Sequence, residues 1–416
     1  MHAVETLTVV RPARGHKDNT RGAETVTVFG EQIHRLMAER RVGLRELARQ
    51  VNYDPGYLSK VVNGRKAVSR DLARRLDEAL GAGGALSAFR VTPDLRGTFT
   101  YDDEERLILA ARCPARLDRE IIRSLAEVLA AEYRQAYKVG SVTMLKAVTA
   151  RLSVVGNLTR EARPPLRGEA LGIAGQYAHF AGWLNANAGR LADAGACCDR
   201  ALGWAAESGD ADMTAITLSL KAHVAWLGGQ VGPTIGLSQA AQRSTSTSAG
   251  VRALAVQLEA RGNALTGDGD NADQKLHEAA GLMGHAAGHP GNESPWMTIC
   301  FSPAYLALQR GLADFYLGRN AHAVEWLSAG LTEMSPEMGK SDWIAWYLVR
   351  LAAAHARAGD PEQACSVAAQ AALIARQTGS SRLRGQLNRL LAQLSARWPA
   401  LPAVADLGEL MKYRDV

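Results

Sequence analysis

Residues 42–64 read VGLRELARQVNYDPGYLSKVVNG, and this stretch decides the fold of the first part of the chain. Its apolar positions recur at helical spacing in two short runs, which predict two short helices around a turn. Asn52 lies at the turn, where Asn tolerates a left-handed backbone better than most residues. Asp54 is a good N-cap, Pro55 suits the first position of the second helix, and Gly64 ends that helix. The stretch therefore predicts a helix-turn-helix unit.

The second helix buries Leu58, Val61 and Val62 and turns small, polar and basic side chains away from the core. A helix with such a face, entering with its N-terminus, fits the major groove of DNA. The sequence therefore predicts a set of DNA-binding residues. Candidates for base contacts are Pro55, Gly56, Ser59 and Lys60, candidates for phosphate contacts are Arg45, Asn63, Arg65 and Lys66, and Tyr57 suits either role.

Leu47-Ala48 in the first helix and the run Tyr57–Arg65 in the second resemble the XRE family of helix-turn-helix regulators. The resemblance covers residues 29–81, including a leading helix and a closing helix. It implies sequence-specific binding to double-stranded DNA and regulation of transcription. Many members of the family carry Gln where this chain has Leu44, so a DNA contact made by that Gln has no counterpart here.

The excess of positive charge lies in the same part of the chain. The 416 residues carry a formal net charge of +6, and 47% of them are apolar, which is enough for two folded domains. Residues 1–90 contain 16 Lys and Arg against 10 Asp and Glu, whereas residues 91–416 contain 32 of each. Attraction to DNA phosphates accounts for this asymmetry, because a protein that is merely basic would spread the excess over its length. A solvated, Arg-rich surface is the alternative explanation.

Several classes of protein are disfavoured by the sequence. The five cysteines are odd in number and lack CxxC spacing, which disfavours a disulfide framework and indicates a reducing cytoplasm. There is no run of 18 apolar residues and no apolar signal core at the N-terminus, so we expect a soluble, cytoplasmic protein without a membrane partner. GxSxG, Walker A and HExxH motifs are absent. We therefore expect neither an enzyme nor a bound cofactor.

Glycines mark a helical repeat in the second half of the chain. From residue 102 onward the composition is helical, and two long helices precede a break at Pro164-Pro165. Five glycines then end successive helices at spacings of 38 to 51 residues. Small residues recur seven positions before, five after and twelve after each glycine, and Thr234 alone among the fifteen is neither Gly nor Ala. The five glycines are Gly189, Gly229, Gly267, Gly318 and Gly359.

These columns of small residues resemble those of the tetratricopeptide repeat, whose paired helices approach closely. The resemblance spans residues 168–378 and departs from the family in length, since about 34 residues is usual there. An irregular Ala-rich bundle is the alternative. The resemblance implies an α-solenoid whose concave face is formed by the first helix of each pair. Carried onto this chain, the residues on that face are His179, Trp183, Asn187, His223, Trp226, Gln257, Arg261, Tyr305, Gln309, Tyr316, Trp346 and Arg350.

Aromatic side chains with a few converging polar groups suit a site for a small molecule or a peptide. Arg261 and Arg350 can clamp a carboxylate in such a site. Ordinary packing between repeats is the alternative for each of the twelve residues taken singly. The set as a whole predicts a ligand-binding groove.

Two irregular segments leave their roles open. Residues 1–28 carry basic side chains among Gly, Pro and polar residues, which predicts a flexible arm that is either an inert tail or a DNA contact. Alternating residues at 7–9 and 26–28 also allow a small hairpin. The loop at 285–301 is either a lid or an excursion without a role. Its His and Cys residues match no zinc pattern, so we expect no metal site; they are His285, His289 and Cys300.

The sequence therefore predicts an all-α protein in five parts. They are the arm at 1–28, an XRE-type DNA-binding domain at 29–90, a linker at 91–101, connecting helices at 102–165, and a tetratricopeptide-like sensor and dimerisation domain at 166–416. An XRE-type head joined to such repeats is similar to the RRNPP quorum-sensing regulators. That similarity implies a homodimer, a two-fold DNA operator and a peptide signal in the groove. A diffusible metabolite is an alternative signal, and a protein-interaction scaffold with secondary DNA binding is the alternative function.

Overall fold

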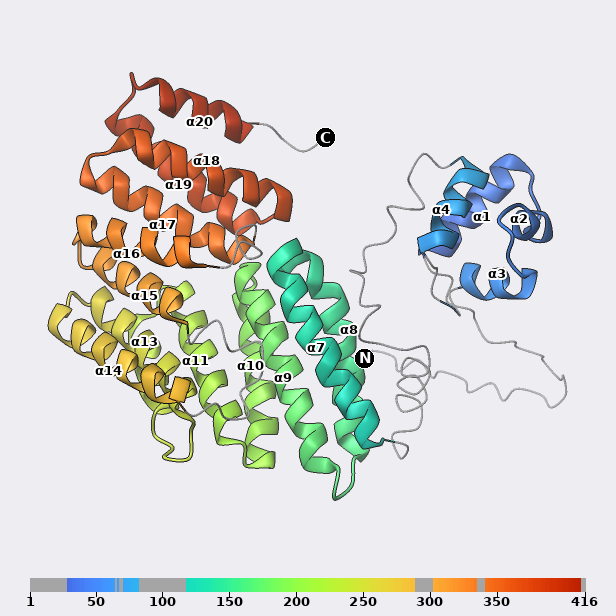
Figure 1. Ribbon diagram of the computed structural model, residues 1–416, viewed down its shortest axis with the longest axis horizontal. Helices are drawn as coiled ribbons and strands as arrows, with labels where there is room; N and C mark the ends of the chain where they lie inside the picture. Colours follow the sequence, from blue (N-terminus) through green and yellow to red (C-terminus); the bar gives the residue numbers. More distant parts are fainter. Residues whose placement is uncertain are drawn as a thin grey trace, which may run out of the picture. The chain divides into compact units, whose positions relative to one another are not determined.

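The computed structural model describes residues 28–63, 66, 70–81, 117–288, 302–334 and 341–412. Within these ranges the chain forms 18 helices and no strand, so the predicted all-α fold is confirmed. The chain divides into two compact units, residues 1–93 and 94–416, which we describe separately. We call the helices of the first unit the head and those of the second the helical domain (Figure 1). None of the described helices is long and apolar enough to cross a membrane.

The head is built on a small core of buried Ile, Leu and Val side chains. Leu47 and Ala48 of one helix pack with Leu58 and Val61 of the next, and Leu76 of the last helix closes the core. Amphipathic helices as short as these owe their stability mainly to such packing. The four helices are α1 (Val28–Arg40), α2 (Leu44–Gln50), α3 (Pro55–Val62) and α4 (Arg70–Leu80).

The helical domain consists of consecutive helix pairs packed side by side (Figure 1). The confirmed arrangement is a series of packed pairs that is consistent with a solenoid. The first two pairs are α7 (Arg119–Val139) with α8 (Ser141–Glu161) and α9 (Arg167–Asn187) with α10 (Leu191–Ser208). They are followed by α11 (Ala211–Leu227) with α12 (Val231–Ala241), α13 (Ala249–Leu265) with α14 (Gly269–Gly288), α15 (Pro303–Tyr316) with α16 (Asn320–Glu333), α17 (Asp342–Ala358) with α18 (Pro361–Thr378), and α19 (Ser381–Arg397) with α20 (Pro402–Lys412).

The five glycines that mark the sequence repeat all close the same turn between the helices of a pair. Each has a positive φ, between 75° and 90°, which a side chain would disfavour. The residue after each glycine donates its N–H to the carbonyl five positions earlier, at 2.8–3.0 Å. This is the Schellman motif, in which the left-handed backbone of glycine lets N–H groups after the helix bond to carbonyls of its last turn.

The three columns of small residues lie in the interior of the helical domain. All fifteen positions are buried. At Gly330 an added Cβ would lie 2.8 Å from the carbonyl oxygen of Ala304 and 2.8 Å from Cγ of Leu308. A backbone oxygen cannot move aside as the end of a side chain can, so α15 and α16 require glycine at this point.

The first helices of successive pairs also contact one another, and the layer that they form curls back on itself. Helix α8 packs against α18. The backbone N–H and the hydroxyl of Ser141 both donate to the carboxylate of Asp342, each at 3.2 Å, across 201 positions of sequence. Gly140 before α8 has no side chain with which to cap that helix, so Asp342 of α17 caps it from outside. Burial raises the pKa of the Asp342 carboxyl, and the bonds from Ser141 oppose that rise.

Several predicted segments lie outside the described residues. These are the arm up to residue 27, the linker at 91–101 and residues 289–301 of the loop. Val28 begins α1, so the hairpin predicted for residues 26–28 is wrong at that position. The described cysteines are free, namely Cys197, Cys198 and Cys365.

Candidate functional site

The N-terminus of α3 is capped and exposed. The carboxylate of Asp54 accepts the backbone N–H of Tyr57 at 2.8 Å, and Pro55 occupies the first turn, where its missing N–H costs nothing. Pro55, Gly56 and Lys60 are exposed, and Ser59 is half-buried. This end of the helix therefore presents small and basic side chains outward.

The turn between α2 and α3 determines which face of α3 is exposed. Asn52 has φ 57°, the left-handed backbone that the sequence predicts. Leu58, Val61 and Val62 are buried on the opposite side of α3, each at most 1% exposed. The helix is therefore held through one face while the other stays open.

The remaining predicted DNA-binding residues lie around α3, apart from Arg65, which lies outside the described residues. The side-chain amide of Asn63 donates to the hydroxyl of Ser59 at 3.4 Å. Nζ of Lys66 lies 4.4 Å from the ring centroid of Tyr57, a cation–π distance. Arg45 is exposed on α2. The structure thus pairs Tyr57 with Lys66 and Ser59 with Asn63.

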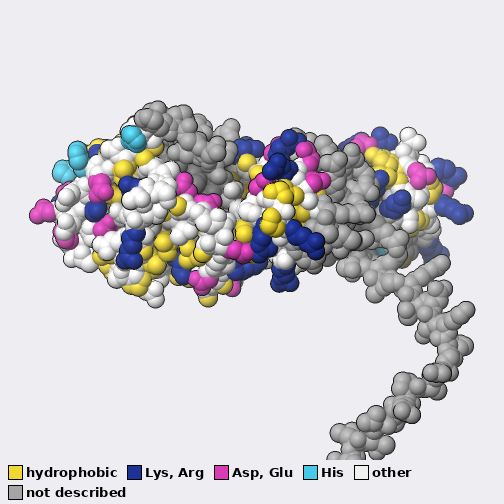
Figure 2. Space-filling view, turned by 90° about the horizontal axis from the view of Figure 1, so that it is seen from below, with side chains coloured by type: hydrophobic (Ala, Val, Ile, Leu, Met, Phe, Trp, Pro, Cys, Tyr) yellow, Lys and Arg dark blue, Asp and Glu magenta, His cyan; other side chains and the backbone are white. Residues whose placement is uncertain are grey.

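Not all basic side chains of the head are equally available to DNA. On α4, Arg74 pairs with Asp71 at 3.0 Å and with Glu78 at 2.7 Å. Within the described residues, no carboxylate pairs with Lys60. Figure 2 shows Lys and Arg side chains (dark blue) on the head, at the right of the view. Lys60 is therefore a free cation on the open face of α3, whereas Arg74 is partly neutralised.

In the helical domain, aromatic and Arg side chains from seven helices meet on one side of the curled layer. We call this set the inner face. Trp183 of α9 and Trp343 of α17 both lie against Tyr137 of α7, with ring centroids 5.6 and 6.3 Å apart. Trp226 of α11 meets Trp346 of α17 edge to face at 5.1 Å. The inner face comprises Tyr137, Trp183, His223, Trp226, Arg261, Tyr305, Gln309, Tyr316, Trp343, Trp346, Tyr347, Arg350 and Arg382.

Arg261 of α13 joins α11 and α15 and is 2% exposed. Its guanidinium donates to Nδ1 of His223 at 3.2 Å and to the amide oxygen of Gln309. It also lies 4.3 Å from the ring of Trp226. Gln309 donates onward to the hydroxyl of Tyr347 at 3.0 Å. Burial and the positive charge of Arg261 hold the pKa of His223 well below its usual range, so His223 is neutral and accepts the bond.

Arg350 and Arg382 lie over one aromatic ring. Their guanidinium carbons are 4.8 and 5.9 Å from the ring centroid of Trp346. Burial lowers the pKa of Arg382 to about 10, and the charge of Arg350 adds to that effect. Both groups remain charged at neutral pH, and both side chains are half-buried.

Of the twelve residues predicted for the groove, nine belong to the inner face and three do not. His179 is buried with Nδ1 3.3 Å from the hydroxyl of Tyr133, and burial lowers its pKa to about 3. Asn187 is buried. Gln257 donates to Sδ of Met283 in α14 at 3.6 Å, so it lies between the helices of its own pair. The inner face is largely filled by its own side chains, because six of its thirteen residues are buried and the other seven are half-buried.

Four residues of the inner face were not predicted. Trp343 stands three positions before Trp346 and four before Tyr347 along α17, a helical spacing that could have found Trp343 and Tyr347. Tyr137 and Arg382 lie outside the five glycine-marked pairs, so the repeat pattern contains no signal for them.

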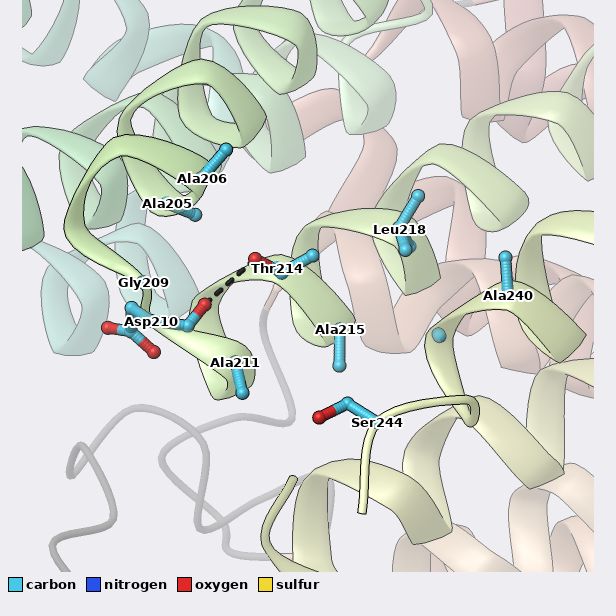
Figure 3. A pocket seen from close by; sticks show the side chains of 11 residues that line it. Ala205, Ala206, Gly209, Asp210, Ala211, Thr214, Ala215, Leu218, Ala240 and Ser244 are labelled. Carbon is cyan, nitrogen blue, oxygen red and sulfur yellow. Dashed lines mark hydrogen bonds between the residues drawn. The ribbon is translucent and has the colours of Figure 1, made fainter. Parts of the chain in front are cut away.

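A separate hollow of about 260 Å³ lies between α10, α11 and α12 (Figure 3). It is lined mainly by Ala side chains such as Ala211 and Ala215. The hydroxyl of Thr214 is already bonded to the carbonyl of Asp210 at 2.8 Å. With no aromatic or basic side chain, this hollow offers little directional recognition, and we place the candidate ligand site on the inner face instead.

Comparison with known proteins identifies the head. Residues 28–89 match the family model of the helix-turn-helix domain. No curated protein matches the chain. The match covers α1–α4 and indicates a DNA-binding regulator.

Proposed function

We propose that the chain is a sequence-specific transcriptional regulator of the XRE type whose helical domain binds a signalling ligand, a peptide or a small molecule. The observation that carries the proposal is α3, a capped helix whose core side is buried and whose open side presents Pro55, Gly56 and Lys60. It belongs to the part of the chain that matches the helix-turn-helix family.

On DNA, α3 would enter the major groove with its N-terminus leading. Gly56 lets the helix approach the base edges, and Lys60 donates to guanine O6 or N7 or to a phosphate. The carboxylate of Asp54 is occupied by the N–H of Tyr57 at 2.8 Å, so its part is to hold the helix end rather than to attract phosphate. Arg45, Asn63 and Lys66 supply backbone contacts in this arrangement.

In the helical domain, the inner face supports a sensing role and no catalytic one. Its polar groups are arginines, amides and phenols set among indoles, a combination suited to orienting a ligand. The proposal assigns no chemical step to the chain. Ligand binding would act on the curl of the layer, which the contact between Ser141 and Asp342 closes.

A change in the curvature of the layer would alter DNA binding by changing the spacing of two heads in a homodimer on a two-fold operator. A ligand shifts that equilibrium only by the difference in its affinity for the two states. The dimer is part of the proposal, and light scattering of the full chain at micromolar concentration tests it: we expect twice the mass of 44.5 kDa.

A gel-shift assay on the DNA upstream of the gene, with and without a cell extract as the source of ligand, tests the function. We compare Lys60→Ala with Arg74→Ala, since each removes one positive charge from the head. Lys60→Ala should weaken specific binding about 10- to 100-fold. Arg74→Ala should change it little, because Asp71 and Glu78 already neutralise that guanidinium.

Equal affinities of the two variants for the DNA would contradict the assignment of α3. Specific DNA binding that the cell extract does not change would support the DNA-binding role and contradict the ligand-sensing role. Retention of a partner protein on the helical domain, with no specific DNA binding, would favour a scaffold.

A further inference from the structure

The inner face concentrates positive charge, and no described carboxylate lies within ion-pair distance of its arginines. Arg261, Arg350 and Arg382 come from α13, α17 and α19, yet all three stand over a pair of indoles that touch edge to face, Trp226 and Trp346. Arg357 and Arg389 add to the positive charge around Arg350. Buried or half-buried cations normally have a charged partner.

Within the described residues, none of the three arginines forms an ion pair with a carboxylate. Asp342 is the acid whose charge acts on Arg382, and its two oxygens are already engaged by Ser141. The partners of Arg261 are neutral, namely His223 and Gln309. Within the described residues, Asp342 therefore offsets only part of the positive charge of the inner face.

Buried donors at the same place lack acceptors. Nε of Arg350, Nε of Arg261 and Nε1 of Trp346 are buried and have no hydrogen-bond partner among the described residues. A buried donor without an acceptor costs free energy, and native proteins usually satisfy such groups. Three donors in one cluster call for a group with several acceptor oxygens.

We propose that Arg350 and Arg382, lying over the Trp346 ring, bind the oxyanion of a small ligand, a carboxylate or a phosphate, with Arg261 and His223 behind them. Planar guanidinium groups present paired N–H donors that match the spacing of two oxyanion oxygens. Both arginines are half-buried, so a ligand can reach them while much of the water is excluded. The inference deepens the proposed sensing role and names the chemistry of the ligand.

The indoles around the arginines define the rest of the ligand. Trp343 stacks on Tyr305 at 5.9 Å and meets Tyr347 edge to face at 5.2 Å, one turn along α17 from Trp346. A ligand that has an apolar portion beside its anionic group would use both surfaces. A fully neutral molecule would leave the guanidinium charge unmatched.

The test uses the full chain and two variants of α19 with the same change in charge. Arg382→Gln removes a guanidinium from the inner face, and Arg384→Gln removes one from an exposed position two residues away. Calorimetry at constant ionic strength measures binding of inorganic phosphate, of succinate, and of neutral succinamide. Phosphate and succinate separate the two sources of an oxyanion, and succinamide lacks the charge.

We expect phosphate or succinate to bind the wild type and Arg384→Gln alike, and Arg382→Gln about 10- to 100-fold more weakly. Succinamide should not bind. Thermal unfolding provides a second readout: without added anion, Arg382→Gln should be at least as stable as Arg384→Gln, because it relieves repulsion from Arg350. Arginines with only a structural role would give the opposite order.

Equal anion affinities in the two variants, or no anion binding by the wild type, would overturn the inference. Binding of DNA is measured on the same samples. Anion binding that leaves the DNA affinity unchanged would uphold the site and contradict the sensing role. Specific DNA binding without an anion site would uphold the head and contradict only this inference.

Discussion

In the head, the candidate functional residues come from one helix of eight residues and its immediate neighbours, and those that the structure describes are exposed or half-buried. In the helical domain, they come from seven helices between residues 137 and 382, and all of them are buried or half-buried. The head supports its open face from behind, through Leu58 and Val61. The inner face has no separate core behind it. Arg261, Gln309 and Tyr347 both supply its polar groups and pack its helices together.

This difference has a consequence for mutations. A side chain on the open face of α3 can change without disturbing the core beneath it. Arg261 and Gln309 of the inner face belong to the hydrogen-bond network that joins the pairs, so loss of either side chain affects binding and stability together. The two units should therefore respond to substitutions separately and in different ways.

The largest effect is expected at the core of the head. Leu58→Ala should lower the free energy of unfolding of the head by about 2–5 kcal/mol, because Leu58 is fully buried in a small core. Specific DNA binding should disappear while the main thermal transition of the helical domain stays in place. A parallel fall of that transition, followed by calorimetry, would show that the units do not unfold separately.

The next effect tests the close packing of the helical domain. Gly330→Ala should cost about 1–3 kcal/mol, since its Cβ would meet the carbonyl oxygen of Ala304 at 2.8 Å. Gly281→Ala at an exposed position of α14, where a Cβ meets nothing within 4 Å, should instead stabilise the fold by about 0.5–1 kcal/mol. Urea unfolding of the two variants measures the difference. Similar behaviour would mean that the columns of small residues do not set the approach of the helices.

The helical domain should also lose stability in mild acid. The pKa of His179 is lowered by burial to about 3, so between pH 6.5 and pH 3 the unfolded chain binds a proton that the folded chain does not. Stability is therefore full above pH 6.5 and falls by about 1.4 kcal/mol per pH unit below it for this group. The pKa of His223 is lowered in the same direction.

The comparison of His179→Gln with the wild type isolates that contribution. Urea unfolding at pH 7.5, 6.0 and 5.0 should show a shallower fall for the variant. The same slope in both proteins would exclude His179 as the source. The head contributes nothing to this difference, because His179 belongs to α9.

The smallest effect is expected at the cap of α3. Asp54→Ala should cost about 0.5–2 kcal/mol, because the N–H of Tyr57 loses its acceptor. Asp54→Ser keeps an acceptor and should restore most of the loss. Hydrogen exchange at the first turn of α3 reports the change directly, and equal protection in both variants would show that the cap contributes little.

Sequence reasoning succeeded where the determinants are local. Asn52, Asp54 and Pro55 specify a turn and a helix start within four residues, and the structure has both. The glycines that end the first helix of each pair, such as Gly189, have the positive φ that the sequence at that turn predicts. Local rules of this kind operate without knowledge of the tertiary fold.

Sequence reasoning failed where the curvature of the helical layer brings together side chains that are distant in sequence. Arg382 reaches Trp346 from a helix beyond the repeat, and Tyr137 reaches Trp343 from a helix before it. Gln257 shares the helical register of its neighbours but points to Met283 in its own pair. Neither spacing nor composition reports the curvature of a solenoid, which arises from small rotations between successive pairs.

The central claim is that the open face of α3 reads a DNA sequence. The most direct measurement selects DNA from random duplexes with the full chain, then compares the affinity for the selected duplex with that for a scrambled one at fixed salt. We predict a ratio of about 10³ or more for the wild type. For Lys60→Ala the ratio should fall about 10- to 100-fold, and for Arg74→Ala it should hold. No enriched sequence, or equal ratios in the two variants, would contradict the account.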